Sequence, residues 1–216
     1  MPQRLGIMGG TFDPVHLGHL RTAEEAIEDL DFDSLLFIPA ADPPHKGDRR
    51  IIPFAHRWNM LDLAVQGNPR FRLSDVEQKM PGKSYTVNTL KHLLQSDCRG
   101  TEMYFLVGLD AFLELHTWWH YLELFRLARM VVVRRPGYRE EETGTFLKQN
   151  ISSGYEWDPD NGFFLHQDLH PVYFLKNTYL DISSTRIRRL RHERRSIRYL
   201  VPDGVMHYIL TKNLYS

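Results

Sequence analysis

Short apolar stretches alternate with segments of helical periodicity along this 216-residue chain. Ser34 to Pro39 (SLLFIP) and Glu102 to Val107 (EMYFLV) are almost wholly apolar, as expected of strands buried on both faces. Strands that alternate with helices form crossover units, which build a parallel sheet covered by helices on both faces. The sequence therefore predicts an α/β fold with a small helical part towards the C-terminal end. Strands are predicted at 5–8, 34–39, 71–73, 102–107, 130–133 and 172–175, and helices at 20–30, 54–65, 86–94, 184–192 and 203–210, with a further helical segment between 107 and 130.

Length and composition bound the class of protein. A chain of 216 residues buries roughly 70% of the surface that its unfolded form exposes, so we expect a single domain over residues 1–216. Basic and acidic residues both total 27, which leaves no global charge to attract nucleic acid or an anionic membrane. One cysteine, Cys98, allows no intrachain disulfide, and no apolar run approaches the ~20 residues that span a bilayer. With no signal-peptide pattern at the N-terminus, these features predict a cytoplasmic protein.

Two local expectations concern polar segments. The helix after the first strand has apolar residues at helical spacing, and its Glu24, Glu25 and Glu28 are expected to face away from the core. Residues 138–171 are rich in Glu, Asp and Gly, and we expect an insertion or surface excursion there. A DPDNG stretch inside it superficially resembles a calcium loop, but the position that would need a glutamate is Leu169, so we reject a calcium site.

The turn after the first strand carries the strongest chemical pattern, GGTFDPVHLGH at residues 9–19. Gly9 and Gly10 allow close backbone approach, and Pro14 makes the turn rigid. His16 and His19 lie three residues apart at the start of a helix, so both imidazoles can project to one side. A helix start also offers unpaired N–H groups and the positive end of the helix dipole. The turn is thus suited to phosphate chemistry.

Two other interpretations of the histidine pair stay open. The H-x-x-H spacing is compatible with a metal pair, with Asp13 as a third ligand, although zinc-peptidase spacing would be H-E-x-x-H. Alternatively, the two histidines only cap the helix and pack against it.

A second helix start reads ISSTRIR at residues 182–188. Ser and Thr in such positions are most often simple helix caps. Paired with the histidine turn, however, the hydroxyls and N–H groups form a second anion cradle, to which Arg188 adds a charged fork. The arginine run that follows is interrupted by Glu193 and lacks interleaved aromatic residues, so we interpret it as a solvated face and expect no nucleic acid partner.

Four further stretches lie in loops near the predicted strand ends or in helices. PPHK at 43–46 brings cations into the loop after the second strand, and GLDAF at 108–112 follows a buried strand, where a ribose or a second substrate would lie. SYTVNTL at 84–90 and HTWW at 116–119 supply a hydroxyl beside aromatic faces, which suits a flat pyridine carboxylate. For PPHK a mobile polar loop, and for Trp119 simple burial in the core, are the alternatives. The candidate side chains in these stretches are His45, Lys46, Asp110, Thr86, Trp118 and Trp119.

These stretches carry a resemblance to a known family. GGTFDPVHLGH resembles the N-terminal signature of the nucleotidyltransferase superfamily, and ISSTRIR matches the second signature, ISSTxIR. Together with PPHK, SYTVNTL, GLDAF, TWW and VVVRRPGY, the order and spacing are similar to those of the bacterial nicotinate mononucleotide adenylyltransferases. The resemblance implies a Rossmann-like, doubly wound parallel sheet and transfer of AMP from ATP to nicotinate mononucleotide with release of pyrophosphate. A phosphopantetheine adenylyltransferase is the nearest enzyme alternative, and an inactive nucleotide-binding regulator is the alternative outside enzymes.

The resemblance also implies roles for individual residues. Catalysis is expected from charge stabilisation, with Mg²⁺ bound mainly through the ATP phosphates and no metal ligands from the protein. A preference for the acid over the amide mononucleotide follows if backbone N–H groups near Trp118 and the Thr86 hydroxyl donate to the substrate carboxylate. The oligomeric state is not indicated by the sequence. Expected catalytic residues are His16, His19, Lys46 and Arg188; expected nucleotide-binding residues are Gly9, Gly10, Thr11, Phe12, Gly108, Asp110, Arg134, Ile182, Ser183, Ser184 and Thr185; and expected mononucleotide-binding residues are His45, Thr86, Trp118 and Trp119.

Overall fold

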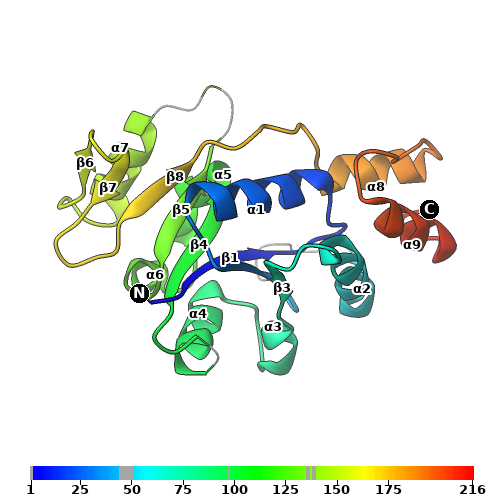
Figure 1. Ribbon diagram of the computed structural model, residues 1–216, viewed down its shortest axis with the longest axis horizontal. Coiled ribbons are helices and arrows are strands. Elements are labelled where there is room, and N and C mark those ends of the chain that lie inside the picture. Colours follow the sequence, from blue (N-terminus) through cyan, green and yellow to red (C-terminus); the bar gives the residue numbers. More distant parts are fainter. Residues whose placement is uncertain (1, 44–50, 97, 135–136, 138–139) are drawn as a thin grey trace.

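The computed structural model describes residues 2–43, 51–96, 98–134, 137 and 140–216. Its strands form one eight-stranded sheet in the order β3-β2-β1-β4-β5-β8-β7-β6. The six strands from β3 to β8 in that order are parallel, and β7 and β6 are antiparallel additions at one edge (Figure 1). The strands are β1 (Arg4–Gly10), β2 (Ser34–Pro39), β3 (Phe71–Leu73), β4 (Glu102–Gly108), β5 (Arg129–Val133), β6 (Glu156–Asp158), β7 (Phe163–Leu165) and β8 (Val172–Leu175).

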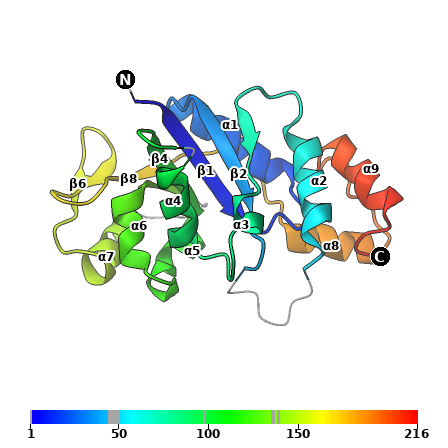
Figure 2. The same ribbon diagram turned by 90° about the horizontal axis from the view of Figure 1, so that it is seen from below.

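Helices connect the parallel strands and cover both faces of the sheet. Figure 1 shows α1 on one side of the sheet and α4 on the other, as expected for a doubly wound α/β protein. Figure 2 shows α8 and α9 beside α2, at the opposite end of the molecule from α7 and β6. The helices are α1 (Leu17–Asp29), α2 (Phe54–Val65), α3 (Val76–Lys79), α4 (Thr86–Gln95), α5 (Leu109–Leu113), α6 (Tyr121–Leu127), α7 (Glu140–Asn150), α8 (Ser184–His192), α9 (Asp203–Thr211) and a 3₁₀ turn, η1 (Leu115–Thr117).

The predicted α/β, Rossmann-like fold is confirmed, including the small helical part formed by α8 and α9. All six predicted strands are present, and five of the predicted helices are found at or within two or three residues of the expected bounds. Strand β2 is buried at every position and β4 at all but its ends, which explains why their sequences are apolar without alternation. In β1, Gly6 is needed because a Cβ there would come within 2.6 Å of the Phe32 ring.

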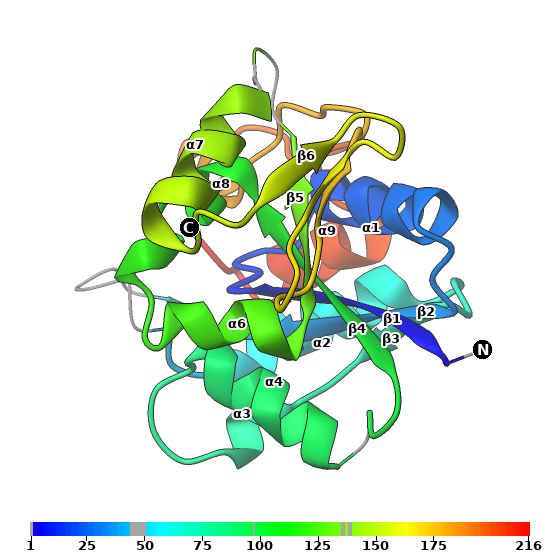
Figure 3. The ribbon, with the colours of Figure 1, turned by 90° about the vertical axis from the view of Figure 1, so that its left-hand side faces the viewer.

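Within the predicted excursion at 138–171, the described residues 140–171 do not form a surface excursion. The described part contains α7 and the β6–β7 hairpin, which Figure 3 shows together at one end of the molecule. Leu147 and Tyr155 are fully buried, and Phe164 pairs with Val172 of β8 across an antiparallel register. Glu156, Asp158 and Asp160 lie between the buried Tyr155 and Phe164, so the average composition concealed a buried face.

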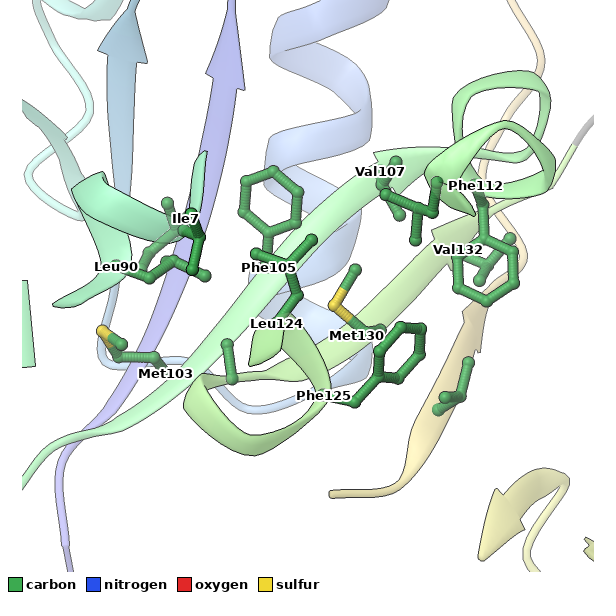
Figure 4. Packing of buried hydrophobic residues seen from close by; sticks show 14 of the residues in the cluster. Ile7, Leu90, Met103, Phe105, Val107, Phe112, Leu124, Phe125, Met130 and Val132 are labelled. Carbon is green, nitrogen blue, oxygen red and sulfur yellow. The ribbon is translucent and has the colours of Figure 1, made fainter. Parts of the chain in front are cut away.

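Two apolar clusters fill the space between the sheet and its helices. One lies against α4, α5, α6 and α7, where Phe125 of α6 lies beside Met130 of β5 (Figure 4). The other lies on the opposite face against α1, α2, α8 and α9, and includes Ile27 of α1 and Ile187 of α8. The sheet is therefore held rigidly from both sides, and the loops at its carboxyl edge start from fixed positions. Within the described residues, no helix is both long and apolar enough to cross a bilayer.

Candidate active site

The sheet reverses its strand order between β1 and β4, and two cavities open at the carboxyl ends of these strands. The first cavity has a volume of about 380 Å³ and the second about 210 Å³. Gly9 lines both, so the two cavities meet at the end of β1. The first cavity is lined by Met8, Gly9, His16, Gly18, His19, Thr22, Leu106, Gly108, Val133, Arg134, Asn177, Tyr179, Leu180, Asp181, Ile182, Ser183 and Ser184, and the second by Gly9, Gly10, Thr11, Ala40, Pro43, Glu77, Ser84, Tyr85, Thr86, Phe105, Trp118 and Trp119.

The two histidines stack where α1 begins. His16 is the N-cap residue of α1, and the ring centroids of His16 and His19 lie 3.7 Å apart. The His16 backbone N–H donates to His19 Nδ1 at 3.3 Å. Because Nδ1 accepts, the proton of a neutral His19 lies on Nε2, which makes Nε2 a hydrogen-bond donor. Phe12, whose φ is 50°, packs edge-on against the His19 ring, with the two ring centroids 5.1 Å apart.

The His16 imidazole is buried but lines the first cavity. The residue is 7% exposed, and burial lowers its pKa to about 4, so it is neutral at pH 7. Its Nδ1 atom has no hydrogen-bond partner within the described part of the chain. A Cβ on Gly18 would lie 3.0 Å from this Nδ1 atom, so a side chain at this position would require the imidazole to shift by a few tenths of an ångström. A buried polar atom beside a cavity is well placed to bind a polar ligand.

The metal interpretation loses its third ligand. The Asp13 carboxylate accepts a hydrogen bond from the Tyr215 hydroxyl at 2.7 Å and lies 3.8 Å from Arg188 Nη1. Nowhere in the described ranges do three His, Cys, Asp or Glu side chains come together in a way that could hold a metal ion. The stacked imidazoles also lie face to face, with planes only 25° apart, where two metal ligands would converge on a point.

The start of α8 contacts the histidine turn directly. Ser184 Oγ donates to the Pro14 carbonyl at 2.8 Å, and Arg188 Nη1 donates to the Asp13 carbonyl at 2.7 Å. Ser183 Oγ accepts from the Arg186 N–H at 3.2 Å and caps the helix. The hydroxyls of Ser183 and Ser184 therefore bond to groups within the protein. The backbone N–H groups in the first turn of α8 remain the anion donors on this side of the cavity.

The structure brings most of the predicted residues to the two cavities. Phe12 is buried beneath the turn, and Asp110, Thr185 and Arg188 lie outside both cavities. His45 and Lys46 lie outside the described residues. The predicted residues that line the first cavity are Gly9, His16, His19, Gly108, Arg134, Ile182, Ser183 and Ser184, and those that line the second are Gly9, Gly10, Thr11, Thr86, Trp118 and Trp119.

Aromatic rings and a helix start form the second cavity. Thr86 is the first residue of α4, and the Tyr85 ring lies 5.6 Å from the Trp119 ring. Trp119 is 55% exposed, so it is not a core residue. Of the backbone N–H groups near Trp118, which we expected to include substrate donors, that of Trp118 itself is already bonded to the Leu115 carbonyl at 2.8 Å within the η1 turn. The N–H groups of the first turn of α4 take its place as candidate donors.

Residues 177–181 form one wall of the first cavity, which the sequence analysis did not predict. Glu25 holds this wall: its carboxylate accepts from the Thr178 N–H at 2.7 Å and from the Thr178 hydroxyl at 2.6 Å. The expectation that Glu25 faces solvent is wrong, since it is 8% exposed. Burial alone would raise its pKa, but the hydrogen bonds from Thr178 and Arg21 hold the pKa below its usual value, so the carboxylate is charged. Helical periodicity could not reveal this contact, because the partner lies 153 residues away.

Strand order, cavity position and two helix starts that face one cavity define a nucleotide-binding protein of the Rossmann-like class. A family model described as cytidylyltransferase-like matches residues 7–190. The chain is 45% identical over 212 residues to a probable nicotinate-nucleotide adenylyltransferase of Syntrophotalea carbinolica, with 98% of this chain and 97% of that one covered. It is 42% identical to one named in the same way from Pelobacter propionicus, with 99% and 98% covered.

Solved structures agree in fold. The Plasmodium falciparum nicotinic acid mononucleotide adenylyltransferase complexed with NaAD matches with a TM-score of 0.74 at 19% identity, over 99% of this chain and 97% of that one. The same enzyme complexed with APC matches with a TM-score of 0.71 at 18% identity, over the same shares of both chains. The chain belongs to the cytidylyltransferase-like family and, within it, to the nicotinate-nucleotide adenylyltransferases.

Proposed function

We propose that this protein transfers AMP from ATP to nicotinate mononucleotide, giving nicotinate adenine dinucleotide and pyrophosphate. The observation that carries this function is the meeting of two cavities at Gly9, one beside the stacked histidines and one beside aromatic rings. A reaction that joins two nucleotides needs two sites whose phosphate ends meet. The names of the relatives at 45% and 42% identity support the same reaction.

The first cavity suits ATP. Two helix starts face it, those of α1 and α8, and each supplies N–H groups and a positive dipole end for phosphates. Gly108 and Arg134 line the same cavity farther along the strand ends, and we assign the nucleoside portion to that part. Mg²⁺ enters as the counter-ion of the ATP phosphates, because such an ion keeps most of its ligands as phosphate and water oxygens.

The second cavity suits the pyridine mononucleotide. Trp119 and Tyr85 offer flat faces on which the pyridine ring can stack. The Thr86 hydroxyl and the first N–H groups of α4 are donors without a buried cation, and a carboxylate accepts from donors whereas an amide would point N–H groups at them. Each mismatched donor pair costs about 1–3 kcal/mol, so we expect the acid to be preferred by at least about a hundredfold in kcat/KM.

The chemical step is a direct displacement. A 5′-phosphate oxygen of the mononucleotide attacks the α-phosphorus of ATP, the bond from that phosphorus to the oxygen bridging to the β-phosphorus breaks, and pyrophosphate leaves. His16 and His19 donate hydrogen bonds to phosphate oxygens as the charge of these oxygens changes, and Arg188 and Lys46 add positive charge. No protein group becomes covalently attached, so positioning and charge stabilisation supply the catalysis.

Product analysis tests the function. The purified protein, incubated with MgATP and nicotinate mononucleotide, should release one pyrophosphate for each dinucleotide detected by mass spectrometry. Phosphopantetheine in place of the mononucleotide should give no pyrophosphate; turnover with it would overturn the proposal in favour of the alternative enzyme. Binding of ATP without any turnover would support a regulator instead.

A second experiment tests the assignment of the second cavity. Thr86→Val removes one donor and should narrow the acid-to-amide ratio in kcat/KM by roughly tenfold while ATP binding is retained. Trp119→Ala should weaken both mononucleotides alike, because ring stacking does not distinguish the two substituents. An unchanged ratio in Thr86→Val would remove the hydroxyl from the specificity site. One domain over residues 1–216, a cytoplasmic location and the absence of nucleic acid partners stay predictions.

A further inference from the structure

A tyrosine far from the motifs contacts the histidine turn. Tyr215 lies in the segment after α9, and its hydroxyl donates to Asp13 Oδ1 at 2.7 Å across 202 residues of sequence. The contact is not a surface one: Asp13 is 4% exposed, and burial beside the Asp13 carboxylate raises the pKa of Tyr215, which keeps the hydroxyl protonated as a donor. Tyr215 is not among the predicted site residues, Asp13 was considered only as a metal ligand, and neither lines the first or second cavity.

Asp13 is the centre of a buried charged cluster. Arg188 Nη1 lies 3.8 Å from the Asp13 Oδ2 atom. Arg57 is 2% exposed; burial lowers the pKa of Arg57, and the nearby Asp13 carboxylate offsets part of that lowering. A buried carboxylate is tolerated only where donors and positive charges surround it. Arg57, Arg188 and the Tyr215 hydroxyl form that surrounding, and only the tyrosine comes within hydrogen-bond distance of the carboxylate.

The same cluster holds the backbone of the turn. Arg57 Nη1 donates to the Thr11 carbonyl at 2.9 Å, and Arg188 Nη1 donates to the Asp13 carbonyl at 2.7 Å. The carbonyls of Thr11 and Asp13 are thus fixed by guanidinium groups from α2 and α8, while the Asp13 side chain is fixed by Tyr215. The segment that carries Tyr215 is itself tied to α8 by Arg191, which donates to Asn213 at 3.3 Å.

We propose that Tyr215 is a positioning residue for adenylyl transfer: its hydroxyl holds the Asp13 carboxylate, and through it the turn that carries His16 and His19. This inference rests on the proposed function. Without the hydroxyl, Asp13 Oδ1 is a buried carboxylate oxygen without its donor, and the nearest compensation is for Arg188 to leave the Asp13 carbonyl for the carboxylate. That exchange releases the turn on the side where the imidazoles are placed.

Tyr215→Phe tests the proposal because it removes one oxygen and keeps the ring. We expect kcat to fall at least about tenfold, since displacement of catalytic groups by a fraction of an ångström lowers the rate of the chemical step. The KM values for ATP and nicotinate mononucleotide should change less than about twofold, as expected when the lost interaction acts in the transition state. The control is Tyr199→Phe, on a tyrosine that is 77% exposed, which should leave kcat unchanged.

A double-mutant cycle makes the test specific. If Tyr215 acts through Asp13, the variant that combines Tyr215→Phe with Asp13→Asn should be no slower than the slower single variant. Multiplicative losses would mean independent roles and would overturn the proposal. A Tyr215→Phe protein with a lower melting temperature but unchanged kcat would also overturn it, because the tyrosine would then be only structural. An unmodified protein that makes no dinucleotide would instead overturn the proposed function, so the two failures are distinguishable.

Discussion

The two helix starts that face the first cavity solve the same problem in different ways. At the start of α1, His16 and His19 present imidazoles, and the buried Nδ1 of His16 has no partner in the described part of the protein. At the start of α8, Ser183 and Ser184 have hydroxyls already engaged, one with Arg186 and one with Pro14. Polar residues at both helix starts gave the same expectation of phosphate contact. In the structure, the start of α1 offers side chains to a ligand, whereas the side chains at the start of α8 hold the α1 turn in place.

Replacement of the His19 imidazole should have the largest effect on kcat. His19→Ala should lower kcat by roughly 10²-fold or more, the loss expected when a donor to developing charge is removed. The melting temperature should fall only slightly, because the residue opens a helix and does not fill the core. His192→Ala, on an exposed histidine of α8, is the matched control and should retain normal turnover. Near-normal turnover of folded His19→Ala would mean that α1 does not supply side-chain donors.

Arg188 connects α8 to the histidine turn from outside the first cavity. In the structure it donates to the Asp13 carbonyl and to Thr185 Oγ1, and a charged hydrogen bond contributes about 1.5–3 kcal/mol. If Arg188 also binds a phosphate, as the family resemblance implies, Arg188→Ala should weaken ATP binding by roughly tenfold or more in calorimetry, whereas Arg189→Ala, on the exposed face of the same helix, should not. Unchanged ATP affinity in Arg188→Ala would restrict this arginine to holding the turn.

Variants of Ser184 and Ser183 separate two roles at the start of α8, which are support of the histidine turn and capping of the helix. Ser184→Ala removes the hydrogen bond to Pro14, worth about 1 kcal/mol, and should lower kcat by roughly fivefold as the turn loosens. Ser183→Ala removes the helix cap and should lower the free energy of unfolding by about 1 kcal/mol with a smaller effect on kcat. Steady-state kinetics and thermal unfolding of both variants give the answer; equal effects on kcat would show that the two hydroxyls cannot be separated in this way.

The smallest predicted effect is the response of the two starts to pH. Burial lowers the folded-state pKa of His16 to about 4 from an ordinary value of 6.5, so the unfolded chain binds this proton first as pH falls. The His16 contribution to stability is complete above about pH 6.5 and is lost progressively towards pH 4. Between pH 7 and pH 6 the free energy of unfolding should drop by about 0.7 kcal/mol from this group. Denaturant unfolding of His16→Asn should lack this pH-dependent change in the free energy of unfolding, whereas Ser183→Ala should keep it. The same change with pH in His16→Asn as in the unmodified protein would contradict the assignment.

The sequence was sufficient for the parallel sheet because its strands are buried on both faces and read as apolar runs. The sequence also predicted that Gly9, His16, Gly108 and Ser184 lie at one site, since the carboxyl ends of parallel strands share one edge, and all four line the first cavity. It could not indicate that Ser184 bonds to Pro14. That contact, like the contact between Glu25 and Thr178, joins residues more than 150 positions apart and depends on how the helices pack.

The β6–β7 hairpin has a consequence for how the protein behaves at high concentration. Without it, Val172–Leu175 would be the outer strand of the sheet, and the sequence VYFL would present apolar side chains along an unpaired backbone. Such an edge is a template on which a neighbouring molecule can add a strand. The hairpin replaces it with β6, which has three residues, two of them the acidic Glu156 and Asp158. The opposite edge, β3, is equally short and carries an exposed arginine, Arg72, so both edges discourage growth of the sheet from one molecule to the next.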